Sequence, residues 1–396
     1  MSYCKIILKP KKEESLLRFH PWVFSGAIAS IKGKPEEGEL VEVYSADNKF
    51  LGIGHYQIGS IAVRILSFQP EVIDKAFWVK KISAAYELRR VLGLAETANH
   101  NTCRLVHGEG DQLPGLVVDI YGQTAVIQAH SVGMHRVRKI ISEAIEEVLG
   151  NAVQHIYYKS EGTLPFKAAL ENENEYLLGG DTGNQHIALE KGLQFHIDWE
   201  KGQKTGFYID QRDNRMLLEK YASKRSVLNL FCYTGGFSVY AMRGGARLVH
   251  SVDSSSKAIS LTQKNVELNF PGDLRHQAFA EDAFDYLEKM DNQYDLIILD
   301  PPAFAKHQNV IRNALQGYRK LNALAFEKIK PGGIIFTFSC SQVVSKNDFR
   351  LTVFSAAAQS GRHVRILHQL TQPADHPVNI YHPEGEYLKG LVLYVV

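Results

Sequence analysis

The sequence predicts an α/β protein made of three consecutive segments, and three observations lead to this prediction. Short runs rich in Val, Ile, Tyr and Phe, punctuated by glycines, occupy roughly the first seventy residues and indicate β-strands. Helical spacing and further strands then occur together up to about residue 200. Beyond that point hydrophobic strands alternate with helices, which is typical of βαβ units in a mostly parallel sheet. A length of 396 residues suits two or three domains of this kind.

The first segment, residues 1–72, is expected to form a small β-barrel. Its predicted strands are the runs KIILKP, ELVEVYSA, FLGIGHYQ and IAVRILSF. One or two helical turns are expected near Pro21–Trp22, and Pro70 marks the expected boundary.

The second segment, residues 73–185, is expected to mix helices and strands. Apolar residues at helical spacing predict a helix from Asp74 to Leu92 and another from about Met134 to Leu149. The runs RLVHGEG, LVVDIYG and TAVIQAH predict strands between these two helices.

The third segment, residues 186–396, carries the parallel sheet. Its predicted strands are SVLNLFC, RLVHSVD, LIILDPP and GIIFTFSC, and FSVYAMR, SSKAISLTQKNVELN and YRKLNALAFEKI are its predicted helices. In doubly wound sheets ligands bind beyond the carboxyl ends of the strands, so candidate site residues are sought there.

Composition excludes several classes of protein. No run approaches about 18 apolar residues, so a membrane-spanning helix is not expected. The charged N-terminal stretch does not resemble an export signal, and we expect a cytoplasmic protein. The four cysteines, scattered without a CxxC pair, suit reduced thiols better than disulfides, and no His/Cys cluster predicts a metal site.

The turn after the first strand of the third segment is a candidate cofactor site. Gly235 and Gly236 allow the backbone to approach a ligand closely, although the spacing is not that of a dinucleotide-binding motif. Asp253 ends the next strand, where a carboxylate can accept both hydroxyls of a ribose; the alternative role is a helix N-cap. Asp282 follows another strand end, where it either faces an adenine amine or begins a helix.

The fourth predicted strand runs directly into Asp300-Pro301-Pro302, with Phe304 two residues further on. Two prolines remove two backbone donors and keep the chain extended, which presents Asp300 and Phe304 rigidly at the ligand edge of the sheet. We therefore expect Asp300 to act in the site, whereas Phe304 either stacks on a base or packs in the core.

Cys340 follows a buried strand at the same edge, so we expect it near Asp300 and interpret it as a nucleophile. Cys4 and Cys103 suit buried apolar positions, and Cys232 is assigned to the wall of the cofactor turn.

Positive charge gathers at two places in the sequence. Between Asp300 and Glu327 there are four basic residues and no acid, which suits phosphate binding or a solvated helix face: Lys306, Arg312, Arg319 and Lys320. Four lysines precede the first acidic residue and suggest a second RNA contact: Lys5, Lys9, Lys11 and Lys12.

Several motifs together resemble a bacterial family of S-adenosylmethionine-dependent RNA methyltransferases, one of which makes 5-methylcytosine in 23S ribosomal RNA. The motifs are GQKTGFYIDQRDNR (202–215), NLFCYTGGFS, VDSSSKAI, LDPPAFAK, FSCS and HPEGEYLKG, with a looser match at RFHPWVFSGAI. The resemblance covers the whole chain. It implies an N-terminal PUA domain over 1–72, an EEHEE central domain over 73–185 and a Rossmann-like methyltransferase domain over 186–396.

The resemblance also implies roles for individual residues. S-adenosylmethionine is expected at the following positions: Asp210, Gln211, Phe231, Tyr233, Thr234, Gly235, Gly236, Asp253, Ser254, Asp282 and Asp300. Arg212 or Arg215 is expected to brace these groups, and helix capping is the alternative for Asp210. Cys340 is the implied nucleophile, and Pro301, Pro302, Phe304, Lys306 and Arg312 are expected to face the RNA. Many RNA cytosine-5 methyltransferases carry a second cysteine where this chain has Ala303, so a single cysteine is expected to serve the chemistry.

The predicted partner is therefore RNA, with 23S ribosomal RNA as the expected one, and the resemblance suggests a homodimer. Carbon 5 of cytosine needs activation by a thiolate at carbon 6, which explains the nucleophile. Two alternatives remain open: methylation of a guanine or adenine nitrogen, which needs no thiol, and a non-catalytic RNA-binding protein.

Overall fold

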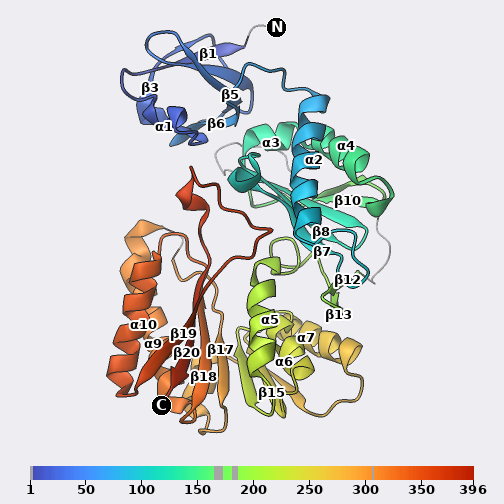
Figure 1. Ribbon diagram of the computed structural model, residues 1–396, viewed down its shortest axis with the longest axis vertical. Coiled ribbons are helices and arrows are strands. Elements are labelled where there is room, and N and C mark those ends of the chain that lie inside the picture. Colours follow the sequence, from blue (N-terminus) through green and yellow to red (C-terminus); the bar gives the residue numbers. More distant parts are fainter. Residues whose placement is uncertain (1–2, 165–172, 181–185, 306) are drawn as a thin grey trace. The chain divides into compact units, whose positions relative to one another are not determined.

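The computed structural model describes residues 3–164, 173–180, 186–305 and 307–396 (Figure 1). The described chain divides into two compact units. One comprises Met1–Gly192, Ile197–Ile209 and Ala374–Gly385, and the other comprises Leu193–His196, Asp210–Pro373 and Glu386–Val396. Each unit thus contains pieces that are distant in sequence, and each is described by itself below.

The first unit begins with a six-stranded barrel-like sheet, in the strand order β2-β6-β5-β4-β1-β3. Its elements are β1 (Cys4–Leu8), α1 (Glu14–Leu17), β2 (Trp22–Phe24), β3 (Ile28–Lys32), β4 (Leu40–Tyr44), β5 (Phe50–Tyr56) and β6 (Ile61–Ser67). Two short helical turns flank Pro21–Trp22, as expected: α1 before it and the 3₁₀ turn η1 (Ser25–Ala27) after it. Trp22 itself pairs with Arg64 in the sheet.

Alternating side chains explain this sheet. In β4, Val41 and Val43 are fully buried while their neighbours are partly exposed, so one face of the strand covers the core. Gly54 in β5 is required by close approach, because a Cβ there would lie 2.0 Å from the carbonyl oxygen of Arg64.

The same unit continues with an α+β domain, whose sheet has the order β11-β10-β9-β8-β7. Its elements are α2 (Lys75–Val91), β7 (Thr102–His107), β8 (Leu116–Tyr121), β9 (Thr124–Ala129), α3 (Val132–Arg136), α4 (Arg138–Leu149), β10 (His155–Tyr158), β11 (Glu175–Leu178) and β12 (Ile187–Glu190). Among the described residues of this sheet, β7, β8 and β9 precede α3 and α4, and β10 and β11 follow them. The sheet therefore has one strand more than the expected EEHEE arrangement.

Both helices expected in this domain are present. Asp74 caps α2 by accepting the backbone N–H of Phe77 at 3.1 Å, as its position before the apolar pattern predicts. The second helix is divided at Val137 into α3 and α4, and Ser131 caps the first of these.

The second unit contains a seven-stranded sheet in the order β16-β15-β14-β17-β18-β20-β19. Its strands are β14 (Ser226–Leu230), β15 (Leu248–Asp253), β16 (His276–Ala280), β17 (Leu296–Leu299), β18 (Gly333–Ser339), β19 (Val364–Thr371) and β20 (Lys389–Val395), with β13 (Leu193–His196) before them. The first five are parallel, whereas β20 is antiparallel to both of its neighbours.

The helices of this unit are α5 (Arg212–Tyr221), α6 (Gly236–Arg243), α7 (Ser256–Asn269), α8 (Ala283–Lys289), α9 (Ile311–Lys328) and α10 (Lys346–Ser360). Strands β14, β17 and β18 are buried along their whole length, which accounts for their continuous apolar runs. In Figure 1, α5, α6 and α7 lie near β15, and α9 and α10 lie beside β18–β20.

Strand order reverses at β14, which has β15 on one side and β17 on the other. Ligands of doubly wound sheets bind at such a switch point, beyond the carboxyl ends of the strands. Register places Leu230, Val252, Leu299 and Thr337 at this edge, so the loops after β14, β15, β17 and β18 begin close together.

Across the described ranges, no helix is both long and apolar enough to cross a membrane.

Candidate active site

The loop between β14 and α6 has an unusual backbone. Phe231, Tyr233 and Gly235 all have positive φ angles, of 58°, 46° and 76°. Such angles are uncommon for residues with a side chain, and they cluster at ligand-binding sites when the surrounding structure maintains them. The loop therefore has one positive φ angle at a glycine, Gly235, where it is unstrained, and two at aromatic residues, Phe231 and Tyr233, where it is strained.

Glycine is required at this turn for steric reasons. A Cβ on Gly235 would lie 2.6 Å from Cγ2 of Thr262, and one on Gly236 would lie 3.0 Å from Cδ of Arg215. Cys232 is buried beside the same threonine, with its Sγ 3.6 Å from Oγ1 of Thr262. Burial raises the pKa of the Cys232 thiol to about 12, which suits the predicted wall position and not a nucleophile.

Asp253 connects the loop after β14 to the loop after β15 through hydrogen bonds. Its Oδ2 accepts the backbone N–H of Tyr233 at 3.0 Å, and its Oδ1 accepts that of Ser255 at 2.9 Å. The N-cap of α7 is Ser255, so the helix-cap alternative for Asp253 is wrong. Ser254 is exposed beside it.

Asp282 begins a helix, which is one of the two roles expected from its position in the sequence. It is the N-cap of α8, and its Oδ1 accepts the N–H of Phe284 at 2.8 Å and that of Asp285 at 3.2 Å. The side chain is exposed, so capping leaves its second oxygen available at the surface.

Asp300 follows β17 directly and is held by a residue from another loop. Gln211 donates its side-chain amide to Oδ1 of Asp300 at 3.0 Å, and Asn214 in turn donates to Oε1 of Gln211 at 2.6 Å. Burial, followed by the negative charge of Asp210, raises the pKa of Asp300 to about 7. Asp300 therefore titrates much closer to neutral pH than an ordinary carboxyl group.

Asp210 lies in the same cluster. Its Oδ2 accepts the hydroxyl of Tyr387 at 2.7 Å, whereas its Oδ1 is buried and has no hydrogen-bond partner among the described residues. The N-cap position of α5 is Gln211, so helix capping does not explain Asp210. A buried carboxylate oxygen without a partner is unusual in a protein interior and suits a cationic or hydroxyl-bearing ligand.

Helix α5 contributes two buried arginines. Arg212 and Arg215 are both buried, and Arg215 lies with its guanidinium carbon 5.9 Å from the ring centre of Tyr240. Arg215 also approaches Gly236, whose added Cβ would lie 3.0 Å from Cδ of this arginine, and its bracing role stays a prediction.

Cys340 lies at the end of β18, half-buried, between two anchored serines. Ser339 donates to the hydroxyl of Tyr318 at 3.0 Å, and Ser341 donates to the carbonyl oxygen of Ala305 at 2.5 Å. Since β17 and β18 are neighbouring parallel strands, Cys340 and Asp300 emerge at the same sheet edge. Burial raises the pKa of Tyr318 to about 12, and the charges of both Cys340 and Asp300 act on it in the same direction.

Lys389 was not identified from the sequence, although it belongs to the HPEGEYLKG motif. Its buried Nζ donates to the carbonyl oxygens of Ser341 and Val344, both at 2.6 Å. Burial lowers the pKa of Lys389 to about 8, against the opposing charge of Cys340. The antiparallel pairing of β20 with β18, Ser339 opposite Lys389, is what brings this ammonium to the cysteine loop.

The expected RNA-facing residues have different surroundings. Phe304 packs on Tyr318 with 4.6 Å between ring centres, which favours the core-packing alternative. Pro301 is buried and Pro302 is exposed. Arg312 is exposed at the start of α9, and Lys306 lies outside the described residues. Lys320 pairs with Glu288 at 3.2 Å, so part of the basic stretch is neutralised.

Two sequence families match this chain. Residues 6–68 match the PUA-like domain, and residues 163–384 match the S-adenosylmethionine-dependent methyltransferase family. The second match spans most of the third segment and includes the loops described above.

Relatives are similar over almost the whole length. A protein of Aeromonas hydrophila called ribosomal RNA large subunit methyltransferase I is 39% identical over 396 residues, which cover 98% of each chain. Proteins of the same name from Tolumonas auensis and Klebsiella pneumoniae are 39% and 36% identical, over 98% and 99% of this chain and 98% of each of theirs.

Solved structures share the fold. A candidate S-adenosylmethionine-dependent methyltransferase of Streptococcus mutans superimposes with a TM-score of 0.84 at 24% identity, over 100% of both chains. A structure of a candidate methyltransferase in complex with SAH has a TM-score of 0.85, also at 24% identity and over 100% of both chains.

Proposed function

Because the chain belongs to the S-adenosylmethionine-dependent methyltransferase family, alongside the ribosomal RNA large subunit methyltransferases I, we propose that it methylates carbon 5 of a cytosine in 23S ribosomal RNA. The observation that carries this proposal is the placement of Cys340 and Asp300 after neighbouring parallel strands, both close enough to Tyr318 for their charges to raise its pKa. A nucleophilic thiol next to a carboxyl group that titrates near neutral pH is what addition to a pyrimidine ring requires.

The residues around β14 fit S-adenosylmethionine. Asp253 is already oriented by two backbone N–H groups, and its carboxylate suits the ribose hydroxyls. The unpartnered Oδ1 of Asp210 suits a cationic part of the cofactor, and Gly235 and Gly236 leave the backbone open to it. When bound, the cofactor supplies a methyl group activated by a positively charged sulfur.

Cys340 acts as the nucleophile in this proposal. Its thiolate forms a bond to carbon 6 of the cytosine, and the electron pair displaced from the ring makes carbon 5 nucleophilic. After carbon 5 has taken the methyl group, a base removes the carbon 5 proton. The electron pair left behind restores the ring double bond and breaks the sulfur–carbon bond, which returns the thiolate.

Asp300 stabilises the ring as the thiolate adds. In its protonated form, it donates a hydrogen bond to the pyrimidine and limits the build-up of negative charge there. Gln211 fixes its orientation, so the carboxyl group is positioned before the substrate arrives.

Lys389 acts as a positioning residue for Cys340. Its two hydrogen bonds fix the backbone that follows the cysteine, and its positive charge favours the thiolate form. The single-cysteine arrangement, with Ala303 beside the diproline, makes such electrostatic support more important, because no second thiol is available there.

RNA is bound by the PUA-like domain and by the rim of the site. The lysines near the N-terminus and Arg312 provide positive charge for phosphates, and the target base must be unstacked to reach Cys340. We further propose a cytoplasmic homodimer, and light scattering on the purified protein tests its dimeric state directly.

The decisive experiment is mass spectrometry of ribosomal RNA nucleosides from a strain lacking the gene and from the same strain carrying it. One 5-methylcytosine should disappear in the deletion strain and return on complementation. Loss of a methylated guanine or adenine instead would replace the cytosine proposal by nitrogen methylation, in which the exocyclic or ring nitrogen attacks directly.

A further inference from the structure

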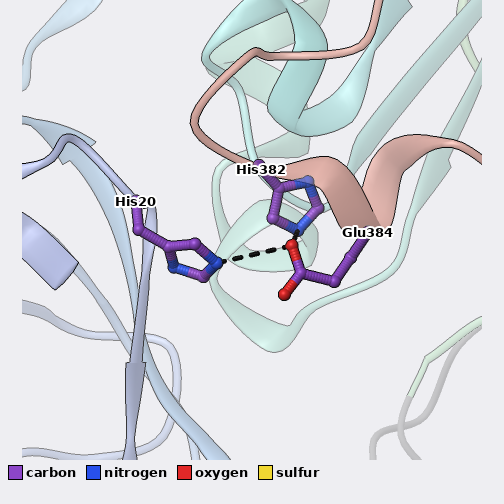
Figure 2. A group of neighbouring side chains, drawn as sticks. All are labelled: His20, His382 and Glu384. Atoms are coloured by element: carbon purple, nitrogen blue, oxygen red, sulfur yellow. Dashed lines mark ion pairs between the residues drawn. The ribbon is translucent and has the colours of Figure 1, made fainter.

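Three side chains that are far apart in the sequence converge in the first unit. His20 precedes β2, whereas His382 and Glu384 belong to the 374–385 segment, and Figure 2 shows the three side chains pointing toward one another. Nε2 of His20 lies 3.5 Å from Oε2 of Glu384, and Nε2 of His382 lies 3.8 Å from the same oxygen. Within the described ranges, this is the one group of three His, Cys, Asp or Glu side chains whose ligand atoms all lie within 4.8 Å.

His382 is the group that calls for an explanation. Only 2% of it is exposed, and neither of its ring nitrogens has a hydrogen-bond partner among the described residues. The ring of Trp22 packs against it, 4.3 Å from centre to centre at 69°, and excludes water from one side. Buried polar groups are nearly always paired, so two unpaired nitrogens on one buried ring indicate a bound species.

The donor set is that of a zinc-type ion. Two imidazole nitrogens and one carboxylate oxygen bind Zn²⁺ at about 2.0–2.2 Å, which sets neighbouring ligand atoms about 3.4 Å apart in a tetrahedral site. The two carboxylate distances of 3.5 and 3.8 Å are close to this spacing. Glu384 is 46% exposed, so its side chain can adjust to a bound ion.

Trp22 organises the second layer of the cluster. Its indole N–H donates to Oε1 of Glu109 at 2.8 Å, which fixes the ring that packs on His382. Its backbone N–H donates to Nδ1 of His20 at 3.2 Å, so Nε2 of His20 carries the proton in the metal-free form. Metal binding at Nε2 moves that proton to Nδ1 and gives up the 3.2 Å hydrogen bond. Because the metal binds only neutral imidazoles, binding should weaken at low pH.

We propose that His20, His382 and Glu384 bind one divalent transition-metal ion of the zinc type. The ion joins the start of the chain to the 374–385 segment, across most of the length of the sequence. Because these ligands belong to the first unit, this site is independent of the methyl-transfer chemistry in the second unit. No spacing in the sequence reveals it, since the two histidines are so far apart.

The test uses the full-length protein after removal of metal with a chelator. Zinc chloride is titrated calorimetrically, and the zinc content is measured after gel filtration. The wild-type protein should bind one zinc per chain, and His20→Ala and Glu384→Gln should each lower the affinity at least about tenfold. Zinc should also raise the thermal midpoint of the wild-type protein, and it should raise that of Glu384→Gln by less at the same zinc concentration.

Controls separate this cluster from other histidines and from the cysteines. His363→Ala, at an exposed position in the other unit, should bind zinc like the wild-type protein. Cobalt bound in place of zinc should show visible d–d bands without the near-ultraviolet absorption of a thiolate ligand. The proposal is overturned if the wild-type protein binds no zinc, if both ligand variants keep wild-type affinity, or if cobalt shows thiolate absorption.

Discussion

Gln211 and Asp300 are joined by a 3.0 Å hydrogen bond from the side-chain amide to Oδ1, across 89 residues of sequence. The bond links the loop before α5 to the end of β17, and it orients a carboxyl group whose pKa is raised to about 7 by burial. Asp300 is therefore held in place and can be protonated at the pH of the cell.

Asp300→Asn tests the protonated carboxyl group through pH. The neutral amide keeps the oxygen that Gln211 binds but cannot titrate. Wild-type turnover should fall as pH rises through 7, because the donor proton is lost, whereas the residual turnover of the variant should lack that step. Asp300→Ala, which removes the donor altogether, should lower turnover by about 10²–10³-fold, as for other lost electrostatic donors. Methyl transfer measured across the neutral pH range tests both statements.

The same substitution should change stability in a direction fixed by linkage. The folded carboxyl group keeps its proton up to about pH 7, while the unfolded one loses it near its ordinary pKa of 3.8. The contribution of Asp300 to the free energy of unfolding of the wild-type protein therefore falls as pH rises from about 4 to about 7. The free energy of unfolding of Asp300→Asn relative to wild type should rise over that range and level off above it. A constant difference in urea unfolding would contradict the raised pKa.

Cys340 and Cys232 should differ completely in covalent chemistry. An RNA containing 5-fluorocytosine cannot lose its carbon 5 substituent after methyl transfer, so the protein should remain joined to it through Cys340. Cys340→Ala should form no such adduct. Cys232→Ala should still form it, because the buried Cys232 thiol has its pKa raised to about 12 and stays protonated. Denaturing electrophoresis detects the adduct, and peptide mapping to Cys232 would refute the assignment.

Lys389 should control the reactivity of the Cys340 thiol. Lys389→Met leaves the carbonyl oxygens of Ser341 and Val344 without this donor and removes the nearby positive charge. The apparent pKa of Cys340 in iodoacetamide alkylation should rise, and turnover should fall at least about tenfold. Lys389→Arg keeps the charge and should be alkylated with the same pH dependence as the wild-type protein. If the two variants are alkylated with the same pH dependence, the role of Lys389 is structural only.

Asp253→Ala should weaken binding of S-adenosylmethionine. The carboxylate offers hydrogen bonds of roughly 1.5–3 kcal/mol each to ribose hydroxyls, so affinity should drop at least about tenfold. The variant also loses the bonds from Tyr233 and Ser255, which hold the turn. Asp74→Ala, which removes a capping carboxylate from α2 in the first unit, is the control and should leave the affinity unchanged. Affinity is measured by calorimetric titration. An unchanged affinity in folded Asp253→Ala would show that the cofactor binds elsewhere or that its ribose is held by other groups.

RNA binding should depend on the N-terminal lysines through salt. Lys11 and Lys12 are exposed, and replacing both with Gln should reduce the slope of log affinity against log salt by about two. Lys264→Gln, which removes one exposed charge from α7, is the control and should leave the slope unchanged. Equal slopes for the wild-type protein and the double variant would exclude this part of the barrel as an RNA contact.

The sequence by itself determined the parallel sheet and the positions of its functional loops. Apolar strands alternating with helices predict which residues follow strand ends, and carboxyl ends of parallel strands share one edge. That reasoning placed Asp253, Asp300 and Cys340 at strand ends without coordinates, because each ends its own strand or follows it directly. Asp74 as the cap of α2 was likewise a local property of the chain.

Only the tertiary structure decided which groups support these residues. Lys389 reaches the Cys340 loop through an antiparallel β20, and Gln211 reaches Asp300 from a loop outside the sheet. Phe304 packs on Tyr318, a choice between two roles that its sequence position left open. His20 and His382 meet for the same reason: side chains brought together by folding carry no spacing signal in the chain, since contact depends on packing in three dimensions.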